Sequence, residues 1–132
     1  MKTLFMDSSA FFAWADQASP QGAAIKALLL KHKPHLITTN FIIAETLSLI
    51  TKRIGKHAGL RFGESVATSQ LIRVIHIDAK TQQEGWQLYK QYQDKDFDLI
   101  DAISFVICKR LNIQEVLTLD HHFAQMTFKT LP

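Results

Sequence analysis

The sequence predicts an α/β domain in which helices flank a mainly parallel sheet. Short apolar runs alternate along the chain with longer stretches of helical period, and this alternation is typical of parallel sheets. The chain has 132 residues and contains no internal repeat, low-complexity tract or Pro/Gly-rich linker. A chain of this length can bury its own core, so we expect a single domain over residues 1–132.

The expected strands share a short apolar or β-branched run of the kind that fills a buried sheet. Two of them, "TLFMD" and "EVLTLD", end in an aspartate. A fifth run near the C-terminus is shorter. The predicted strands are Thr3–Asp7, His35–Thr39, Arg73–Asp78, Glu115–Asp120 and a last one within "FKTL" at 128–131.

The expected helices share longer apolar patterns, and turn signals such as Ser19-Pro20-Gln21-Gly22, Lys33-Pro34 and Gly55 separate them. Thr39 or Asn40 is the expected N-cap of the third helix, and Asp98 that of the last. The predicted helices are Ala10–Ala15, Ala23–Lys31, Asn40–Arg53, Ala58–Leu71, Ala79–Gln93 and Asp98–Leu111.

Composition narrows the possible function classes. The single cysteine, Cys108, excludes an internal disulfide and a Cys-rich zinc cluster, and its apolar helical setting predicts a buried thiol. The net charge of +3 is compatible with a polyanionic partner. The sequence has neither a secretory h-region nor an apolar run of about 18 residues, so we expect a cytoplasmic protein without a membrane segment.

Two acidic residues stand where an apolar strand run stops. Asp7 follows "TLFM" and Asp120 follows "VLTL". Each could simply cap or turn the next segment. In parallel sheets, however, sites gather at the carboxyl ends of strands, so the two side chains could also converge at one edge.

Two further carboxylates belong to predicted helices. The helical neighbours of Glu45 are mostly apolar, which predicts a partly buried side chain. Asp101 lies three residues after Asp98 at the start of the apolar run Ala102–Cys108, where it could complete a capping box. Local capping is therefore an alternative to a functional role for Asp101.

Taken together, the four carboxylates suggest a metal site. An unpaired carboxylate in an apolar setting is costly, and gathering like charges raises the pKa of at least one group. A divalent cation removes this repulsion. A ligand set rich in carboxylates and free of sulfur suits Mg²⁺ or Mn²⁺ better than zinc, and such an ion can activate a water for attack on a phosphodiester.

Three segments carry a family resemblance: "FMDSSAFFAW", "TTNFIIAETLSLI" and "DFDLIDAISFVICKRLNIQEVLTLDHHF". In their order and spacing they resemble the PIN domain, specifically the VapC-type toxin ribonucleases, over nearly the whole chain except residues 55–95. The resemblance implies a PIN-like three-layer α/β/α sandwich and RNA cleavage that depends on Mg²⁺ or Mn²⁺. It also implies a possible antitoxin partner and a homodimer.

The resemblance further implies catalytic and metal-binding roles for a set of acidic residues, with polar residues in support. Asp98 stands where related sequences commonly have Ser or Thr. The acidic set is Asp7, Glu45, Asp101 and Asp120, and the supporting set is Ser8, Asn40, Thr118 and Asp98.

Other readings remain open at this point. An aspartyl phosphotransferase with Asp7 as nucleophile commonly needs a second Asp two residues later, where this chain has Ser9. A non-catalytic module that binds nucleic acid or protein would use the carboxylates only as caps or docking groups. His121 and His122 follow Asp120, but adjacent side chains do not easily share one site, and we assign them no role. The RNA target, the dimer interface and the number of metal ions are not predictable.

Overall fold

The computed structural model describes residues 2–132 and contains five parallel strands in one sheet. Their order across the sheet is β3-β2-β1-β4-β5. The strands are listed by their bounds: β1 Thr3–Met6, β2 His35–Thr39, β3 Ile72–Ile75, β4 Glu115–Leu117 and β5 Lys129–Leu131. The predicted α/β class with a parallel sheet is confirmed.

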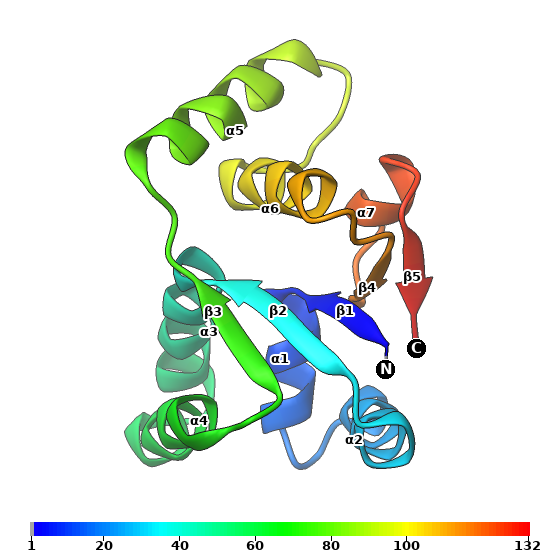
Figure 1. The fold of residues 1–132 in the computed structure, drawn as a ribbon. Coiled ribbons are helices and arrows are strands. Elements are labelled where there is room, and N and C mark those ends of the chain that lie inside the picture. Colours follow the sequence, from blue (N-terminus) through cyan, green and yellow to red (C-terminus); the bar gives the residue numbers. More distant parts are fainter. Residues whose placement is uncertain (1) are drawn as a thin grey trace.

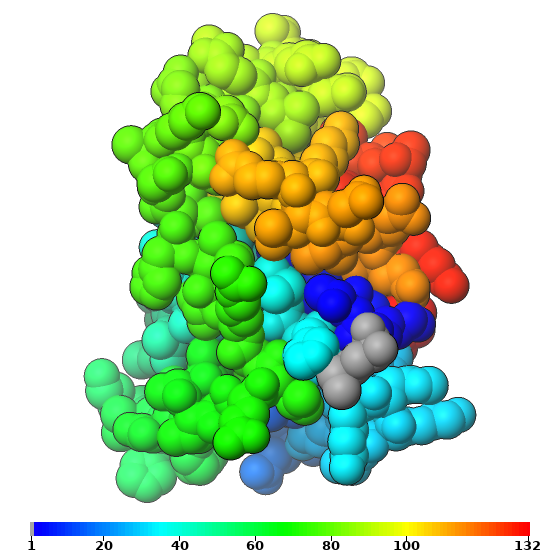
Figure 2. Space-filling view, in the orientation of Figure 1, coloured from blue at the N-terminus to red at the C-terminus, as the bar shows by residue number. Residues whose placement is uncertain are grey.

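Helices cover both faces of the sheet, as the predicted three-layer sandwich requires (Figure 1). One layer holds α1 Ser8–Ala15, α2 Pro20–His32, α3 Asn40–Arg53 and α4 Lys56–Thr68. The other holds α5 Ala79–Gln91, α6 Leu99–Arg110 and α7 His122–Gln125. The space-filling view shows α5 and α4 at opposite ends of the molecule (Figure 2).

The strand order creates a switch point between β1 and β4. The chain leaves β1 toward β2 and β3 through the first helical layer, then returns to β4 beside β1 through the second. Parallel crossovers are right-handed, so reversing direction across the sheet places the helices on the opposite face. The carboxyl ends of β1 and β4 therefore border the crevice where open α/β sheets bind ligands.

Some predicted element ends are wrong, and pairing explains the largest error. The strand predicted to run to Asp78 ends at Ile75, opposite Thr39 at the end of β2. As an edge strand, β3 has no further partner beyond that point, and the N–H of Ile77 donates to Oδ1 of Asn40 instead, at 2.9 Å. Asp78 then caps α5 through the Thr81 N–H.

Aromatic side chains in the core pack α6 against the loop before it and against α7. Phe105 of α6 is fully buried and makes edge-to-face contacts with Phe97 and Phe123, at centroid distances of 5.1 and 5.0 Å. Cys108 is also fully buried, as predicted, and burial raises the pKa of its thiol. Such aromatic packing fixes where the first turn of α6 lies relative to the sheet edge.

Candidate active site

Asp7 directly follows β1 and is almost fully buried, with 3% of its surface exposed. Its backbone N–H donates to the carbonyl of Leu117 at 3.2 Å, which joins the ends of β1 and β4. One carboxylate oxygen, Oδ1, accepts from Ser9 Oγ at 2.7 Å and from the Ala10 N–H at 3.2 Å. Asp7 therefore does cap α1, as the local alternative required, while its second oxygen faces β4.

The residues after β4 complete the contact with Asp7. Met6 pairs with Leu117, so the next residues, Asp7 and Thr118, stand side by side. Thr118 Oγ1 donates to Asp7 Oδ2 at 2.7 Å and accepts from the Asp120 N–H at 3.2 Å. The Thr118 hydroxyl thus binds the side chain of Asp7 and the backbone of Asp120.

Asp101 comes to the same region from the first turn of α6. The Asp98 carboxylate accepts from the Asp101 N–H at 2.9 Å, and Asp101 Oδ2 accepts from the Asp98 N–H at 3.1 Å. This capping box and the N-cap role of Asp98 are confirmed. The box also fixes the Asp101 rotamer, and the side chain remains only 15% exposed.

Burial and like charges make two of these acids hard to ionise. Burial is the main cause that raises the pKa of Asp7 to about 7, and the charge of Asp120 adds to it, against the hydrogen bonds from Thr118 and Ser9. Burial also raises the pKa of Asp101 to about 8, with the charges of Asp98, Asp120 and Asp7 contributing. The charges of these acids therefore act on one another. From the sequence we expected a raised pKa in at least one of them, and two have one.

His122 lies in the site, although we expected no role for it from its sequence position. Its Nδ1 lies 3.3 Å from Asp101 Oδ2 and 3.5 Å from Asp120 Oδ1. The Asp120 carboxylate accepts from the His122 N–H at 3.0 Å, and this tight turn folds the imidazole back over the acids. The signal available in the sequence was the spacing of two residues between a strand-end Asp and a His.

The remaining predicted residues lie apart from this hydrogen-bond network. Glu45 is half-buried on α3, and within residues 2–132 its side chain forms neither a hydrogen bond nor an ion pair. Asn40 binds the Ile77 N–H, as described above. Ser8 is half-buried, whereas its neighbour Ser9 both donates to Asp7 and accepts from the Leu119 N–H at 2.9 Å. The serine that supports Asp7 is therefore Ser9.

The donor set fits a hard divalent cation. In the described part of the chain, no Lys or Arg nitrogen lies within 4.0 Å of the carboxylate oxygens of Asp7, Asp101 or Asp120. Carboxylate oxygens are the ligands that Mg²⁺ and Mn²⁺ prefer, and a cation here would lower the raised pKa values. Two groups of potential ligands occur among residues 2–132, and one of them comprises Asp101, Asp120 and His122.

Comparison with known families decides the classification. The PIN domain family matches residues 4–129. The chain belongs to the PIN domain family. The match runs from Leu4 in β1 to Lys129, the first residue of β5, and includes each of the acids described above.

Two proteins from Mycobacterium tuberculosis are similar to this chain. The 23S rRNA-specific endonuclease VapC20 is 24% identical over 125 residues, which cover 95% of both chains. Ribonuclease VapC26 is 26% identical over 124 residues, covering 93% of this chain and 91% of the relative.

Solved structures show the same fold. The crystal structure of VapC20, described as a Sarcin-Ricin loop cleaving toxin, matches with a TM-score of 0.88 at 23% identity over 95% of both chains. FitAcB from Neisseria gonorrhoeae matches with a TM-score of 0.68 at 14% identity, over 98% of this chain and 96% of that one. Within the described residues, no helix is both long and apolar enough to span a bilayer.

Proposed function

We propose that this PIN domain is a metal-dependent endoribonuclease, and that it is the toxin of a toxin–antitoxin pair. The observation that carries the proposal is the meeting of Asp7, Asp101 and Asp120 at the switch point of the sheet, where two of the acids have a raised pKa. The names of VapC20 and VapC26, an rRNA endonuclease and a ribonuclease, support RNA as the substrate.

Each acid has a proposed role as ligand to Mg²⁺ or Mn²⁺, with Glu45 as the fourth. The ion, when bound, supplies a water activated for attack on phosphorus and offsets charge in the transition state. Thr118 and Ser9 hold the Asp7 carboxylate in a single orientation. The Asp98 N–H does the same for Asp101.

A cleavage assay with neutralised acids tests this function. Both Asp7→Asn and Asp101→Asn remove the charge. Asp101→Asn keeps an oxygen for the Asp98 N–H, whereas Asp7→Asn keeps an acceptor for only one of the two sides on which Asp7 is bound. We expect wild-type protein to cleave RNA with Mg²⁺ or Mn²⁺ but not with EDTA, and both variants to be inactive. Asp94→Asn, an exposed acid outside the site, is the matched control and should remain active.

The ribonuclease proposal would fail if wild-type protein free of any antitoxin left both structured and single-stranded RNAs intact with either ion. A non-catalytic binding module would then be favoured. Glu45→Gln, compared with the exposed control Glu64→Gln, tests the fourth ligand. A reduced affinity for Mn²⁺ is expected only in the Glu45 variant.

We further propose the setting in which the enzyme works. Residues 1–132 act as one domain, in the cytoplasm, as a homodimer that an antitoxin protein inhibits. The description of VapC20 as a toxin supports the antitoxin partner. Light scattering on purified protein tests the dimer, and a monomer at micromolar concentration would count against it.

A further inference from the structure

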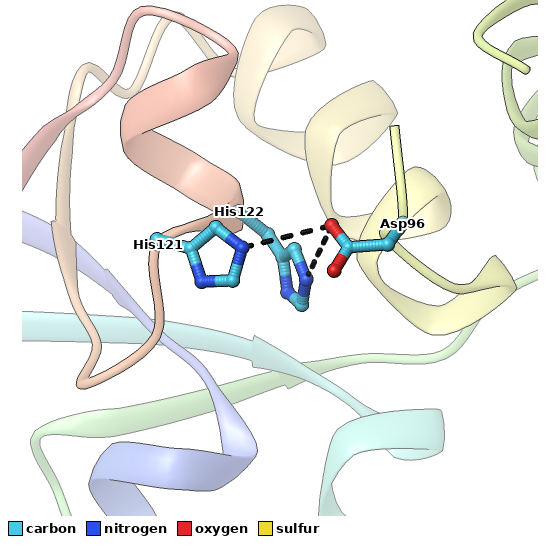
Figure 3. Close-up of side chains that lie close together, drawn as sticks. All are labelled: Asp96, His121 and His122. Atoms are coloured by element: carbon cyan, nitrogen blue, oxygen red, sulfur yellow. Dashed lines mark ion pairs between the residues drawn. The ribbon is translucent and has the colours of Figure 1, made fainter. Parts of the chain in front are cut away.

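A second group of potential ligands lies beside the carboxylate site and involves neither Asp7 nor Asp101. It consists of Asp96, in the loop before α6, and of His121 and His122 at the start of α7 (Figure 3). His122 Nε2 lies 3.3 Å from Asp96 Oδ1, and His121 Nε2 lies 3.6 Å from the same oxygen. The adjacent histidines thus approach one partner, contrary to our expectation, and their ring centroids lie 4.4 Å apart.

Ordinary hydrogen bonding does not account for this arrangement. Both ring nitrogens of His122 are closed off from solvent, and neither makes a hydrogen bond of acceptable geometry within residues 2–132. Buried polar atoms normally find a partner, since leaving one unpaired costs about 1–3 kcal/mol. His122 Nε2 therefore lies close to Asp96 Oδ1 but does not form a hydrogen bond with it.

The distances instead match those between ligands of one transition-metal ion. Four ligands at about 2.0–2.1 Å from a tetrahedral Zn²⁺ lie about 3.3 Å from one another. The two measured separations from Asp96 Oδ1 are 3.3 and 3.6 Å. A small movement of the exposed His121 and Asp96 side chains, 62% and 72% accessible, would close the second gap.

We propose that Asp96, His121 and His122 form a binding site for Zn²⁺ or a similar transition-metal cation. Two imidazoles and one carboxylate suit such an ion, whereas the neighbouring acids suit Mg²⁺. Three protein ligands leave a fourth position for water. With Nε2 on the ion, the other His122 nitrogen carries its proton toward Asp101 Oδ2, 3.3 Å away. A carboxylate that accepts from a metal-bound histidine is a common way of fixing the ring.

The position of the site implies a structural consequence. The ion would join the loop before α6 to the start of α7, which are 25 positions apart in the sequence, counting from Asp96 to His121. The site borders the carboxylates through His122, whose Nδ1 lies 3.3 Å from Asp101 Oδ2 and 3.5 Å from Asp120 Oδ1. Because the ion binds only the folded chain, it should raise the midpoint of thermal unfolding.

Calorimetric titration of metal-free protein with Zn²⁺ tests the proposal. We expect one site whose affinity falls at least tenfold in His121→Ala and in Asp96→Asn, neither of which is part of the proposed catalytic set. His57→Ala, an exposed histidine on α4, is the matched control and should bind as wild type does. Zn²⁺ should also raise the unfolding temperature of wild type and of the control more than that of His121→Ala.

Two results would overturn the site. One is the absence of Zn²⁺ binding by the wild-type protein. The other is undiminished Zn²⁺ affinity in His121→Ala, and if Asp7→Asn abolished that binding, the ion would belong to the carboxylates. Both readouts measure binding and not RNA cleavage, so this proposal can fail or succeed independently of the ribonuclease function.

Discussion

Neutralising Asp7 should stabilise the metal-free protein while it abolishes the proposed activity. The pKa of Asp7 is raised from 3.8 to about 7 in the folded protein, chiefly by burial. The folded state therefore binds a proton more tightly than the unfolded chain does. The stability that comes from this proton is fully present below pH 3.8 and is lost as the pH rises through about 7.

The size of the effect follows from the two pKa values. The pKa differs by about three units between the two states, and each unit corresponds to about 1.4 kcal/mol. Relative to low pH, the Asp7 carboxyl group therefore lowers the free energy of unfolding by about 4 kcal/mol at pH 8, where it is ionised in both states. At pH 5, where only the unfolded chain ionises it, the loss is about 2 kcal/mol. Asp7→Asn has no charge at either pH, so its gain in unfolding free energy over wild type should be larger at pH 8 than at pH 5.

Urea denaturation in EDTA at both pH values measures this gain. Asp94→Asn serves as the control, because its carboxylate is exposed and away from the site. Added Mg²⁺ should recover part of the lost stability in wild type but not in Asp7→Asn. If Asp7→Asn were no more stable than wild type at pH 8, burial of a charge at this position would not be the dominant effect.

Three further predictions concern neighbouring features. Thr118→Val removes the donor to Asp7 Oδ2, so the pKa of Asp7 should rise further. Mn²⁺ binding should then need a higher pH, and an unchanged pH midpoint of Mn²⁺ binding would contradict this. Gly85→Ala places a methyl group 2.5 Å from Ile103 Cγ1, and urea denaturation should show a loss of about 1–3 kcal/mol; unchanged stability would mean that α5 shifts freely on α6. The Cys108 thiol is fully buried with a raised pKa, so it should react with a thiol reagent only on unfolding, and rapid labelling of native protein would refute that.

Much of the secondary structure could be predicted because its causes are local. The segments 35–39 and 40–53 have the predicted bounds, since a β-branched run meets a capping Thr39 and a regular helical pattern there. Asp98 and Asp101 lie three positions apart and form the capping box within one turn. The short α7 was missed because four residues are too few to show a periodic pattern.

The sequence by itself determined which acids follow strands or begin helices, and hence which side chains are available for a metal site. Only the tertiary structure decided which of them meet. The pairing of β1 with β4 brings Asp7 and Thr118 to 2.7 Å although they lie 111 positions apart. The turn after Asp120 adds His122 to the same place. Strand order and register depend on packing across the whole core, so a local pattern of residues cannot specify these contacts.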